Sequence, residues 1–353
     1  MKNVDVLFAD NPFDAVLVVS EVNGFYFSDF RADNVYALIE RGALTLFLDG
    51  RYTRAAAEKF GEDKAVRIVD ITLKNPYGEI KRLLDEKGVK LLGFENLSVK
   101  YSDYERVKAL DRVLVGAEAA INALRRKKTA DEIFRIKTAA KIADGAYKKV
   151  LCTIKAGVSE KETADELIYL MRRGGAEDVS FDPIVAFGAN TAEPHHVYGG
   201  KRLAIGDAVT IDMGAKYSGY CSDMTRSFIF GRPNDKYLEI YGVVREAQKT
   251  AAGAIVAGMT AKQADQAARG VIEAAGYGKY FSHSLGHSVG VEIHEPPSLS
   301  QKSDAVLAVG DVVTVEPGLY IEGLFGVRIE DMGVVGEGGF ESFSNSEKAA
   351  VLP

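Results

Sequence analysis

The feature that most constrains the fold is an internal repeat in the second half of the chain. GDAVTIDMG, residues 206–214, aligns with GDVVTVEPG, residues 310–318, at an offset of 104 (310 minus 206). AGVSEKE from Ala156 aligns with AGMTAKQ from Ala257 at an offset of 101 (257 minus 156). Each copy of the repeat therefore has a helix followed by a β segment. This order predicts two related α+β halves that face each other across a shared axis. The alternative is that glycine and aspartate before alternating apolar residues are a common opening of unrelated strands.

Each copy of the repeat also carries two acidic residues. Asp212 is followed by Asp223, and Glu316 by Glu330, with a glycine-containing turn between the members of each pair. Four carboxylates near one axis would repel one another too strongly to ionise in a partly buried site without cations. Two divalent metal ions would balance their four charges.

The histidines point to the same part of the chain. All five lie within residues 195–294, and three of them occur in HSLGHSVGVEIHEPP between the two repeats. A site with mostly oxygen ligands and one imidazole suits Mn, Co, Fe or Zn, and it differs from a closed zinc site made of thiolates. Two such ions would bridge and deprotonate a water while one polarises a scissile carbonyl. The other histidines would bind substrate or stabilise developing charge, whereas an isolated histidine is more often structural.

The first third of the chain has a different pattern. Short β-branched runs alternate with amphipathic segments, which predicts an α/β layer with a mixed sheet. Strands are expected within 14–20, 34–50, 64–71, 90–95 and 112–116, and helices within 51–60, 76–88 and 101–110. Thr129-Ala-Asp-Glu132 is a capping-box pattern that opens a long helix, and a second helix is expected at 159–175. We place the domain boundary after residue 121, which gives domains 1–121 and 122–353.

Composition limits the classes of partner. The 353 residues are 47% hydrophobic and 27% charged with a net charge of -6, and this acidic balance argues against a nucleic-acid partner. Since no segment has the pattern of a signal peptide or the length of a membrane span, we expect a cytoplasmic protein with no membrane partner. The two cysteines form no disulfide framework, and we expect Cys152, on a helix, and Cys221, on a strand, to be buried thiols.

The acids and histidines resemble the centre of a known family. The order Asp212, Asp223, His287, Glu316, Glu330 is similar to the five metal ligands of the pita-bread metallopeptidases, the group with methionine aminopeptidase, aminopeptidase P and prolidase. The resemblance to the prolidase and aminopeptidase P branch covers residues 120–353, and the segments that carry it are PHH at 194–196, IDMGAKYSGYCSDMTRSF, HSLGHSVGVEIHEPP, EPGLYI and GVRIED. It implies an α+β pita-bread fold with two pseudo-symmetric halves, preceded by a smaller α/β creatinase-like domain.

The resemblance also implies roles for single residues. The five ligands would hold two metal ions, Mn or Co in preference to Zn or Fe, and Glu316 would also handle protons. His195, His283 and His294 would line the substrate site. Arg328 would orient Glu330 or meet substrate, unless it is only a strand arginine paired with a neighbouring acid.

The implied reaction is metal-dependent hydrolysis of the Xaa-Pro bond in short proline-containing peptides by a homodimer. A dipeptidase of the prolidase type is favoured, and an aminopeptidase P acting on longer peptides is the alternative. Glu193, Ser288 and the 322–326 segment depart from the pattern of the branch without removing a ligand, so they bear on substrate preference.

Two other functions fit parts of the sequence. GHSVG, residues 286–290, matches a serine nucleophile elbow with Ser288 as nucleophile, but that motif needs a strand before it and a helix after it. Pro296 and Pro297 oppose such a helix. A non-catalytic peptide-binding module is the second possibility, and it would be expected to have lost metal ligands, whereas all five are present.

Overall fold

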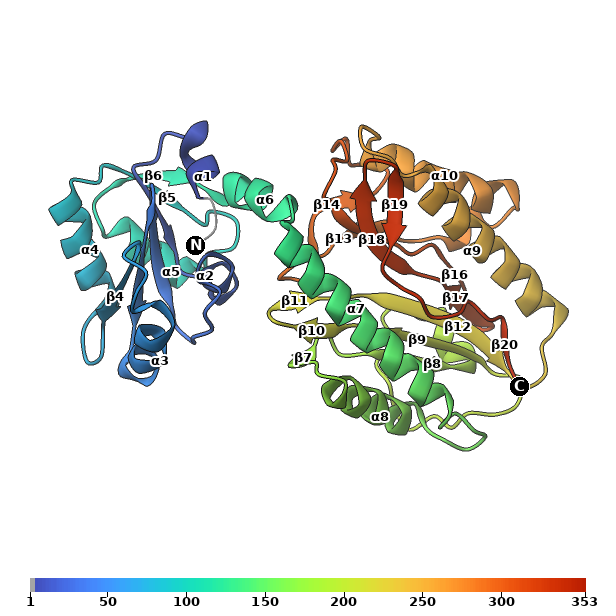
Figure 1. Cartoon of the computed structure of the whole chain (residues 1–353). Helices are drawn as coiled ribbons and strands as arrows, with labels where there is room; N and C mark the ends of the chain where they lie inside the picture. Colours follow the sequence, from blue (N-terminus) through green and yellow to red (C-terminus); the bar gives the residue numbers. More distant parts are fainter. Residues whose placement is uncertain (1–3) are drawn as a thin grey trace. The chain divides into compact units, whose positions relative to one another are not determined.

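The computed structural model describes residues 4–353, and the chain divides into two compact units, residues 1–125 and 126–353 (Figure 1). The boundary expected after residue 121 lies inside helix α6 (Glu118–Arg126), whose last residue is the first of the second unit.

The first unit is a mixed six-stranded sheet with helices, as predicted. Its strand order is β4-β3-β2-β1-β5-β6, with antiparallel pairing of β1 with β2 and β2 with β3, and parallel pairing elsewhere. The elements are α1 (Asp5–Ala9), β1 (Ala15–Val18), α2 (Glu21–Ser28), β2 (Tyr36–Glu40), β3 (Ala43–Leu48), α3 (Gly50–Phe60), β4 (Val66–Asp70), α4 (Pro76–Lys87), β5 (Leu91–Phe94), α5 (Tyr101–Lys108) and β6 (Val113–Gly116).

The second unit consists of two halves with the same order of elements, which confirms the fold expected from the repeat. The first half has α7 (Ala130–Leu151), α8 (Glu160–Arg173), β8 (Ile184–Phe187), β9 (Ala208–Met213) and β12 (Met224–Phe230). The second half has α9 (Asp235–Ala254), α10 (Ala261–Ala274), β13 (Gly286–Ser288), β15 (Val312–Val315) and β18 (Asp331–Gly336). In each half the three strands pair antiparallel in the order given.

The correspondence extends to single residues. Helices α8 and α10 both begin with a capping box, formed by Ser159 with Glu162 and by Thr260 with Gln263. The glycines that precede them, Gly157 and Gly258, have φ of 88° and 90°, a left-handed conformation that favours glycine.

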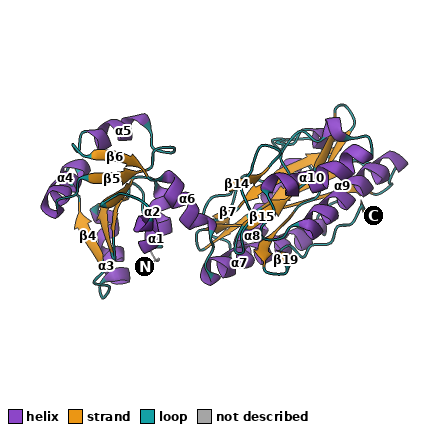
Figure 2. Ribbon diagram, turned by 90° about the horizontal axis from the view of Figure 1, so that it is seen from above, coloured by secondary structure: helices purple, strands orange, loops and turns teal. Residues whose placement is uncertain are grey.

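Helices lie along the strands in both halves (Figure 2), and two hydrophobic clusters fill the space between helices and strands. Residues of α7 and α8 pack on β8, β9 and β12, and residues of α9 and α10 pack on β15 and β18. Shorter elements complete the unit: β7 (Asp178–Val179), η1 (Gly188–Ala192), β10 (Ala215–Tyr217), β11 (Tyr220–Cys221), η2 (Gly278–Tyr280), β14 (Glu295–Leu299), β16 (Gly318–Ile321), β17 (Phe325–Arg328), β19 (Gly339–Ser342) and β20 (Val351–Leu352).

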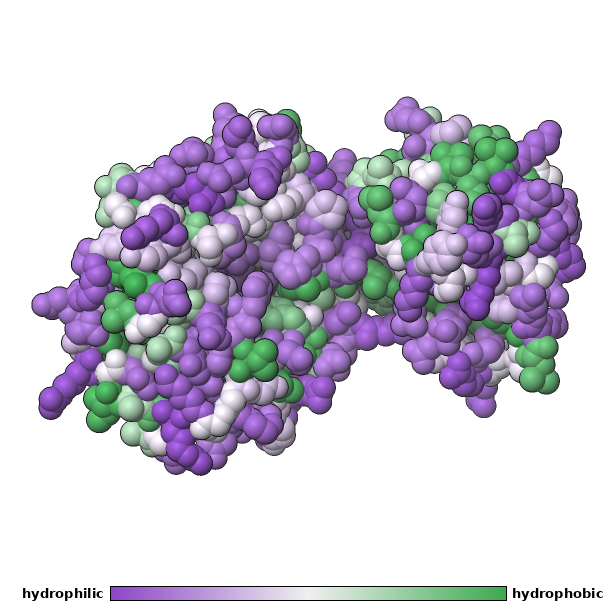
Figure 3. Space-filling view, turned by 180° about the vertical axis from the view of Figure 1, so that it is seen from behind, coloured by the Kyte–Doolittle hydropathy of each residue, from purple (hydrophilic) through white to green (hydrophobic). Residues whose placement is uncertain are grey.

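The surface carries apolar residues only in scattered groups on the face that Figure 3 shows. Among residues 4–353 no helix is both long and apolar enough to cross a membrane. One expectation about the cysteines is wrong: Cys221 is buried on β11, but Cys152 is exposed because it caps the C-terminus of α7 instead of facing the core.

Candidate metal centre and substrate pocket

The four acids lie where paired strands of the two halves end. Asp212, on β9, is paired with Thr225 of β12, and Asp223 directly precedes β12. Glu316 directly follows β15, and Glu330 directly precedes β18, which is the antiparallel partner of β15. Antiparallel pairing brings the end of one strand beside the start of the next. The register therefore places two acids together in each half.

The two halves meet at these acids. The backbone N–H of Glu330 donates to the carbonyl oxygen of Thr225 at 3.1 Å, and the Thr225 hydroxyl donates to Oε2 of Glu330 at 2.7 Å. Asp212 from the first half raises the pKa of Glu330 in the second, next after burial and Glu316. The arrangement agrees with the shared axis expected from the repeat.

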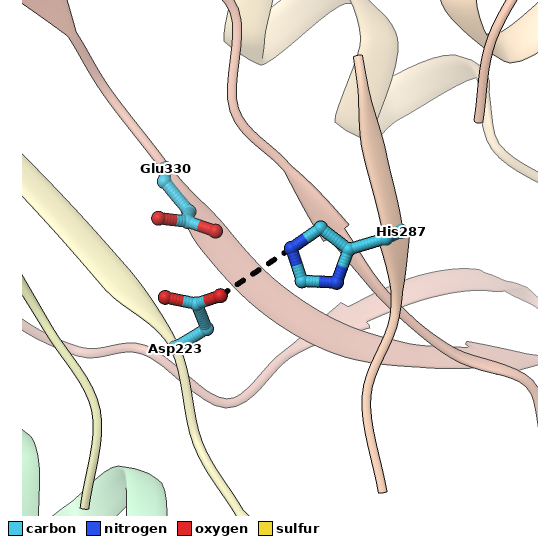
Figure 4. A group of neighbouring side chains, drawn as sticks. All are labelled: Asp223, His287 and Glu330. Carbon is cyan, nitrogen blue, oxygen red and sulfur yellow. Dashed lines mark ion pairs between the residues drawn. The ribbon is translucent and has the colours of Figure 1, made fainter. Parts of the chain in front are cut away.

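His287, on β13, points its ring at the acids (Figure 4). Its Nε2 lies 3.5 Å from Oδ2 of Asp223 and 3.4 Å from Oε1 of Glu316. Asp223, His287 and Glu330 each offer one ligand atom within 4.8 Å of the others. Nδ1 of His287 lies 3.1 Å from the carbonyl oxygen of Ser288, which can only accept. That contact assigns the proton to Nδ1, so Nε2 presents a lone pair to the carboxylates.

This donor set fits a divalent cation. A lone pair on Nε2 faces two carboxylate oxygens at 3.4 and 3.5 Å, and none of the three atoms carries a proton when the acids are ionised. In addition, Oδ1 of Asp212 and Oε1 of Glu330 are buried without a hydrogen-bond partner. Buried oxygens of this kind need a partner, and oxygen ligands with one imidazole suit a transition metal.

Burial and mutual repulsion shift the pKa values of these groups. Burial, then Glu330 and Asp212, raises the pKa of Asp223 well above its usual value. Burial, opposed by Arg328 and reinforced by Asp212, raises the pKa of Glu316 to about 8. Burial lowers the pKa of His287 to about 4. Without cations, protons would have to neutralise the acids, whereas bound cations would take over that role.

Arg328 lies behind the acids in a network that the sequence did not predict in full. Its Nη2 donates to Oδ2 of Asp212 at 2.7 Å, and its Nε donates to the Thr225 hydroxyl at 3.1 Å. It therefore contacts Asp212 directly, and reaches Glu330, which we expected it to orient, only through Thr225. Nη1 also donates to the Tyr320 hydroxyl at 2.8 Å. Thr225 and Tyr320 lie within the segments IDMGAKYSGYCSDMTRSF and EPGLYI, but the sequence assigned them no role, and only their neighbours in the fold identify it.

Two of the other histidines lie beside this network. Nδ1 of His283 lies 2.8 Å from the carbonyl oxygen of Ser284, and its Nε2 lies 2.9 Å from the Tyr320 hydroxyl. Because Arg328 already donates to Tyr320, that hydroxyl donates to His283, whose pKa burial and Arg328 lower to about 4. The ring of His294 packs on the ring of His287 at 4.3 Å between centroids.

A cavity of about 810 Å³ opens above the acids, and all its lining residues belong to the second unit. His195, His283 and His294 line it, as do four of the five expected ligands and Arg328. Glu330 is too deeply buried to reach its wall, with 1% of its surface exposed. Apolar side chains supply another part of the lining: Phe181, Pro183, Ile184, Pro194, Val197, Ile293 and Pro296.

The structure does not support a serine nucleophile at residue 288. Ser288 ends the short strand β13, and no helix follows it before residue 300. Its side chain is 1% exposed, and its hydroxyl has no hydrogen-bond partner, including any general base. The side chain therefore cannot reach a substrate in the cavity.

Comparison with known families gives two matches that together span nearly the whole chain. Residues 134–337 match the metallopeptidase family M24, and residues 1–127 match the creatinase/prolidase N-terminal domain. All five expected ligands lie within the first of these two ranges.

Individual relatives align over nearly their full length. The Xaa-Pro dipeptidase of Pyrococcus furiosus is 40% identical over 96% of this chain and 95% of its own. The solved Xaa-Pro dipeptidase of Bacillus anthracis has a TM-score of 0.94 at 40% identity, covering 100% of this chain and 99% of that one. The X-Pro aminopeptidase of Thermotoga maritima has a TM-score of 0.90 at 35% identity, covering 96% and 98%.

Proposed function

The chain belongs to metallopeptidase family M24, and from this premise we propose that it hydrolyses the Xaa-Pro bond of short peptides. The observation that carries the proposal is the centre itself. An imidazole lone pair and carboxylate oxygens from both halves converge at the floor of a cavity large enough for a peptide. The pocket volume lies in the range typical of small-molecule sites.

The proposed ligands are Asp212, Asp223, His287, Glu316 and Glu330, holding two divalent ions, with Mn or Co favoured over Zn or Fe. Bound ions of this kind activate water and polarise the scissile carbonyl. The unpartnered oxygens of Asp212 and Glu330 and the tautomer of His287 support this assignment.

Glu316 is the proposed proton carrier. Its Oε1 lies 3.4 Å from Nε2 of the His287 ring, at the cavity that would hold the substrate, where a carboxylate can accept and return a proton. The Thr314 hydroxyl donates to Oε1 of Glu316 at 3.1 Å and accepts from the backbone N–H of His287 at 3.0 Å. One side chain therefore positions both groups.

His195, His283 and His294 are proposed to contact the substrate. His283 is neutral, with Nδ1 donating to a carbonyl, and its Nε2 is shared with Tyr320. The exposed rings of His195 and His294 lie on the cavity wall. Arg328 fixes Asp212 and thereby acts as a positioning residue. The apolar lining suits a proline ring and the apolar part of the preceding residue.

Between the two possible substrate lengths, we propose the dipeptidase, with the aminopeptidase as the second candidate. The names of similar proteins support both: the Pyrococcus furiosus and Bacillus anthracis relatives are Xaa-Pro dipeptidases, and that of Thermotoga maritima is an X-Pro aminopeptidase. A homodimer in the cytoplasm remains our proposal for the assembly and its location.

Three substrates test this function. The protein loaded with Mn should cleave Ala-Pro and leave Ala-Ala uncleaved, and cleavage should be followed by chromatography of the products. Faster cleavage of Ala-Pro-Ala than of Ala-Pro would select the aminopeptidase. Equal cleavage of Ala-Ala and Ala-Pro would overturn the requirement for proline.

A further inference from the structure

A buried carboxylate organises the segment that carries His195. Glu160 lies at the start of α8 and is 0% exposed. Its Oε1 accepts from the backbone N–H of Phe187 at 2.9 Å and from the Asn190 side chain at 2.8 Å. Its Oε2 accepts from the backbone N–H of Gly199 at 3.0 Å and contacts the His196 ring at 3.1 Å. One side chain thus binds both ends and the middle of residues 187–199.

His196 lies between two carboxylates. Its Nε2 faces Oε2 of Glu160 at 3.1 Å, and its Nδ1 faces Oε2 of Glu193 at 3.0 Å. Carboxylates accept hydrogen bonds, so both contacts are satisfied only when both ring nitrogens are protonated. Nδ2 of Asn190 lies 3.2 Å from Nε2 but is itself a donor, and it donates to Oε1 of Glu160 at 2.8 Å. The geometry therefore describes an imidazolium ion held by one buried acid and one exposed acid.

His195 is fixed by its neighbours. Its own ring makes no side-chain hydrogen bond to any of residues 4–353. On one side, the carbonyl oxygen of Pro194 accepts from Nη1 of Arg328 at 3.2 Å. On the other side, His196 is bound to Glu160. The position of His195 on the cavity wall therefore depends on these two anchors.

Buried pairs of an acid and a cation also lie next to the other two pocket histidines, His283 and His294. Arg269 forms a buried pair with Asp265 on α10 and donates to the carbonyl oxygen of His283 at 2.9 Å. Lys128 forms a buried pair with Glu295, the residue after His294, at 2.8 Å. Each of the three histidines thus has a buried acid paired with a cation next to it. Only at His195 is that cation a histidine, whose ordinary pKa is the nearest to neutral pH among the charged side chains.

We propose that Glu160 and His196 form a positioning pair that holds His195 in the substrate pocket, with His196 acting in its charged form. The pair contacts none of the acids of the metal centre. The His196 ring reaches the cavity wall, but carboxylates occupy both of its nitrogens, so its proposed role is to position His195 and not to act in catalysis. The substrate-binding part of the proposal rests on the proposed function, and the structural part does not.

The pKa of His196 agrees with this geometry. Partial burial would lower that pKa, but hydrogen bonds to Glu193 and Glu160 outweigh burial and raise it. A raised pKa in the folded state means that the stabilising charge is present at low pH and is lost as pH rises through the folded value. The segment 187–199 should therefore loosen on the alkaline side of the His196 titration.

Hydrogen–deuterium exchange of the metal-loaded protein tests the pair without using activity. After correction for intrinsic exchange, residues 187–199 of the wild type should lose protection as pH rises past the His196 titration. His196→Gln and the isosteric Glu160→Gln should exchange there roughly tenfold faster or more at neutral pH, because a charge-assisted hydrogen bond is lost. Asp265→Asn is the matched control, and it should loosen residues 281–287 instead. Circular dichroism would verify that each variant is folded.

Kinetics on Ala-Pro then tests the consequence for substrate. The wild type should show a KM that rises at alkaline pH. His196→Gln should raise KM roughly tenfold at neutral pH, with a smaller change in kcat, and should remove that alkaline rise. Wild-type exchange of residues 187–199 in His196→Gln would overturn the pair. A wild type that does not cleave Ala-Pro but shows the expected exchange pattern would contradict the proposed function and leave the positioning pair supported.

Discussion

At the scale of single residues, the tautomer of His287 gives the strongest indication of a metal. Its Nδ1 faces a carbonyl oxygen while its Nε2 faces two carboxylates, so the chain provides ligand atoms and no hydrogen-bond donor between them. A second-layer acceptor that fixes the ring is the usual arrangement for a ligand histidine. The sequence could nominate His287, but it could not show which nitrogen is free.

The acids predict how pH changes the stability of the metal-free protein. Glu316 binds a proton up to about pH 8 when folded but only to about 4.5 when unfolded. The folded state therefore binds more protons in this range, and its free energy of unfolding falls as pH rises. His287 acts in the opposite direction, but only between about pH 4 and 6.5.

Between pH 6.5 and 8, therefore, chelated protein should lose thermal stability, and added Mn should restore it most at pH 8. Differential scanning calorimetry with and without chelator measures both effects. Metal-free protein that is more stable at pH 8 than at pH 6.5 would contradict the pKa shifts of the acids.

Ser288 gives a prediction that separates the metal site from the serine alternative. Its buried hydroxyl has no partner, so Ser288→Ala removes a polar group without breaking a hydrogen bond. We expect activity on Ala-Pro within about twofold of wild type and an unfolding free energy that is unchanged or higher by roughly 1 kcal/mol. Peptide cleavage assays and urea denaturation would measure these quantities. Loss of activity in a folded Ser288→Ala protein would restore the serine nucleophile.

At the scale of elements, close backbone contacts around the acids require glycine. A Cβ at Gly214 would lie 1.9 Å from the carbonyl oxygen of Ser222 and 2.8 Å from the Ser180 hydroxyl. Gly214 follows Asp212 by two residues, and Ser222 directly precedes Asp223. The glycine thus allows the two acids of the first half to approach each other.

Gly214→Ala should therefore lower the free energy of unfolding by roughly 3 kcal/mol and weaken metal binding. Gly145→Ala is a suitable control, because Gly145 lies inside α7 and a Cβ there would meet no atom within 4 Å. That change should stabilise the protein by about 1 kcal/mol through helix propensity. Chemical denaturation and metal titration would compare the two variants. Equal unfolding free energies for the two variants would contradict this prediction, because the backbone at Gly214 and Ser222 could then move apart without a loss of stability.

Elements with clear periodicity could be predicted from the sequence, and others could not. The capping box at Thr129 marked the start of α7 correctly. Helix α2 was missed because it buries residues on most of its surface, so no polar face reveals its period. Cys152 was misassigned to the core because a helix C-cap and a buried helical position look alike in sequence.

At the scale of the whole chain, the repeat predicted the most, because it specified both the fold of the second unit and the convergence of four acids. The residues that position those acids could not be predicted from the sequence. Thr225 contacts Glu330 and also Arg328, which lies 103 residues further along the chain. His196, which supports the pocket and not the acids, contacts Glu160, 36 residues away. No pattern along one chain records such contacts.

The central claim is that two pairs of acids and one histidine form a dinuclear metal centre that hydrolyses peptides. The most direct test is to strip the protein with a chelator and titrate it with Mn while following Ala-Pro cleavage and bound metal. We predict no activity without metal, full activity at two ions per chain, and neither second-ion binding nor activity in Asp223→Asn. Full activity in metal-free protein, or near-normal activity in Asp223→Asn, would contradict the account.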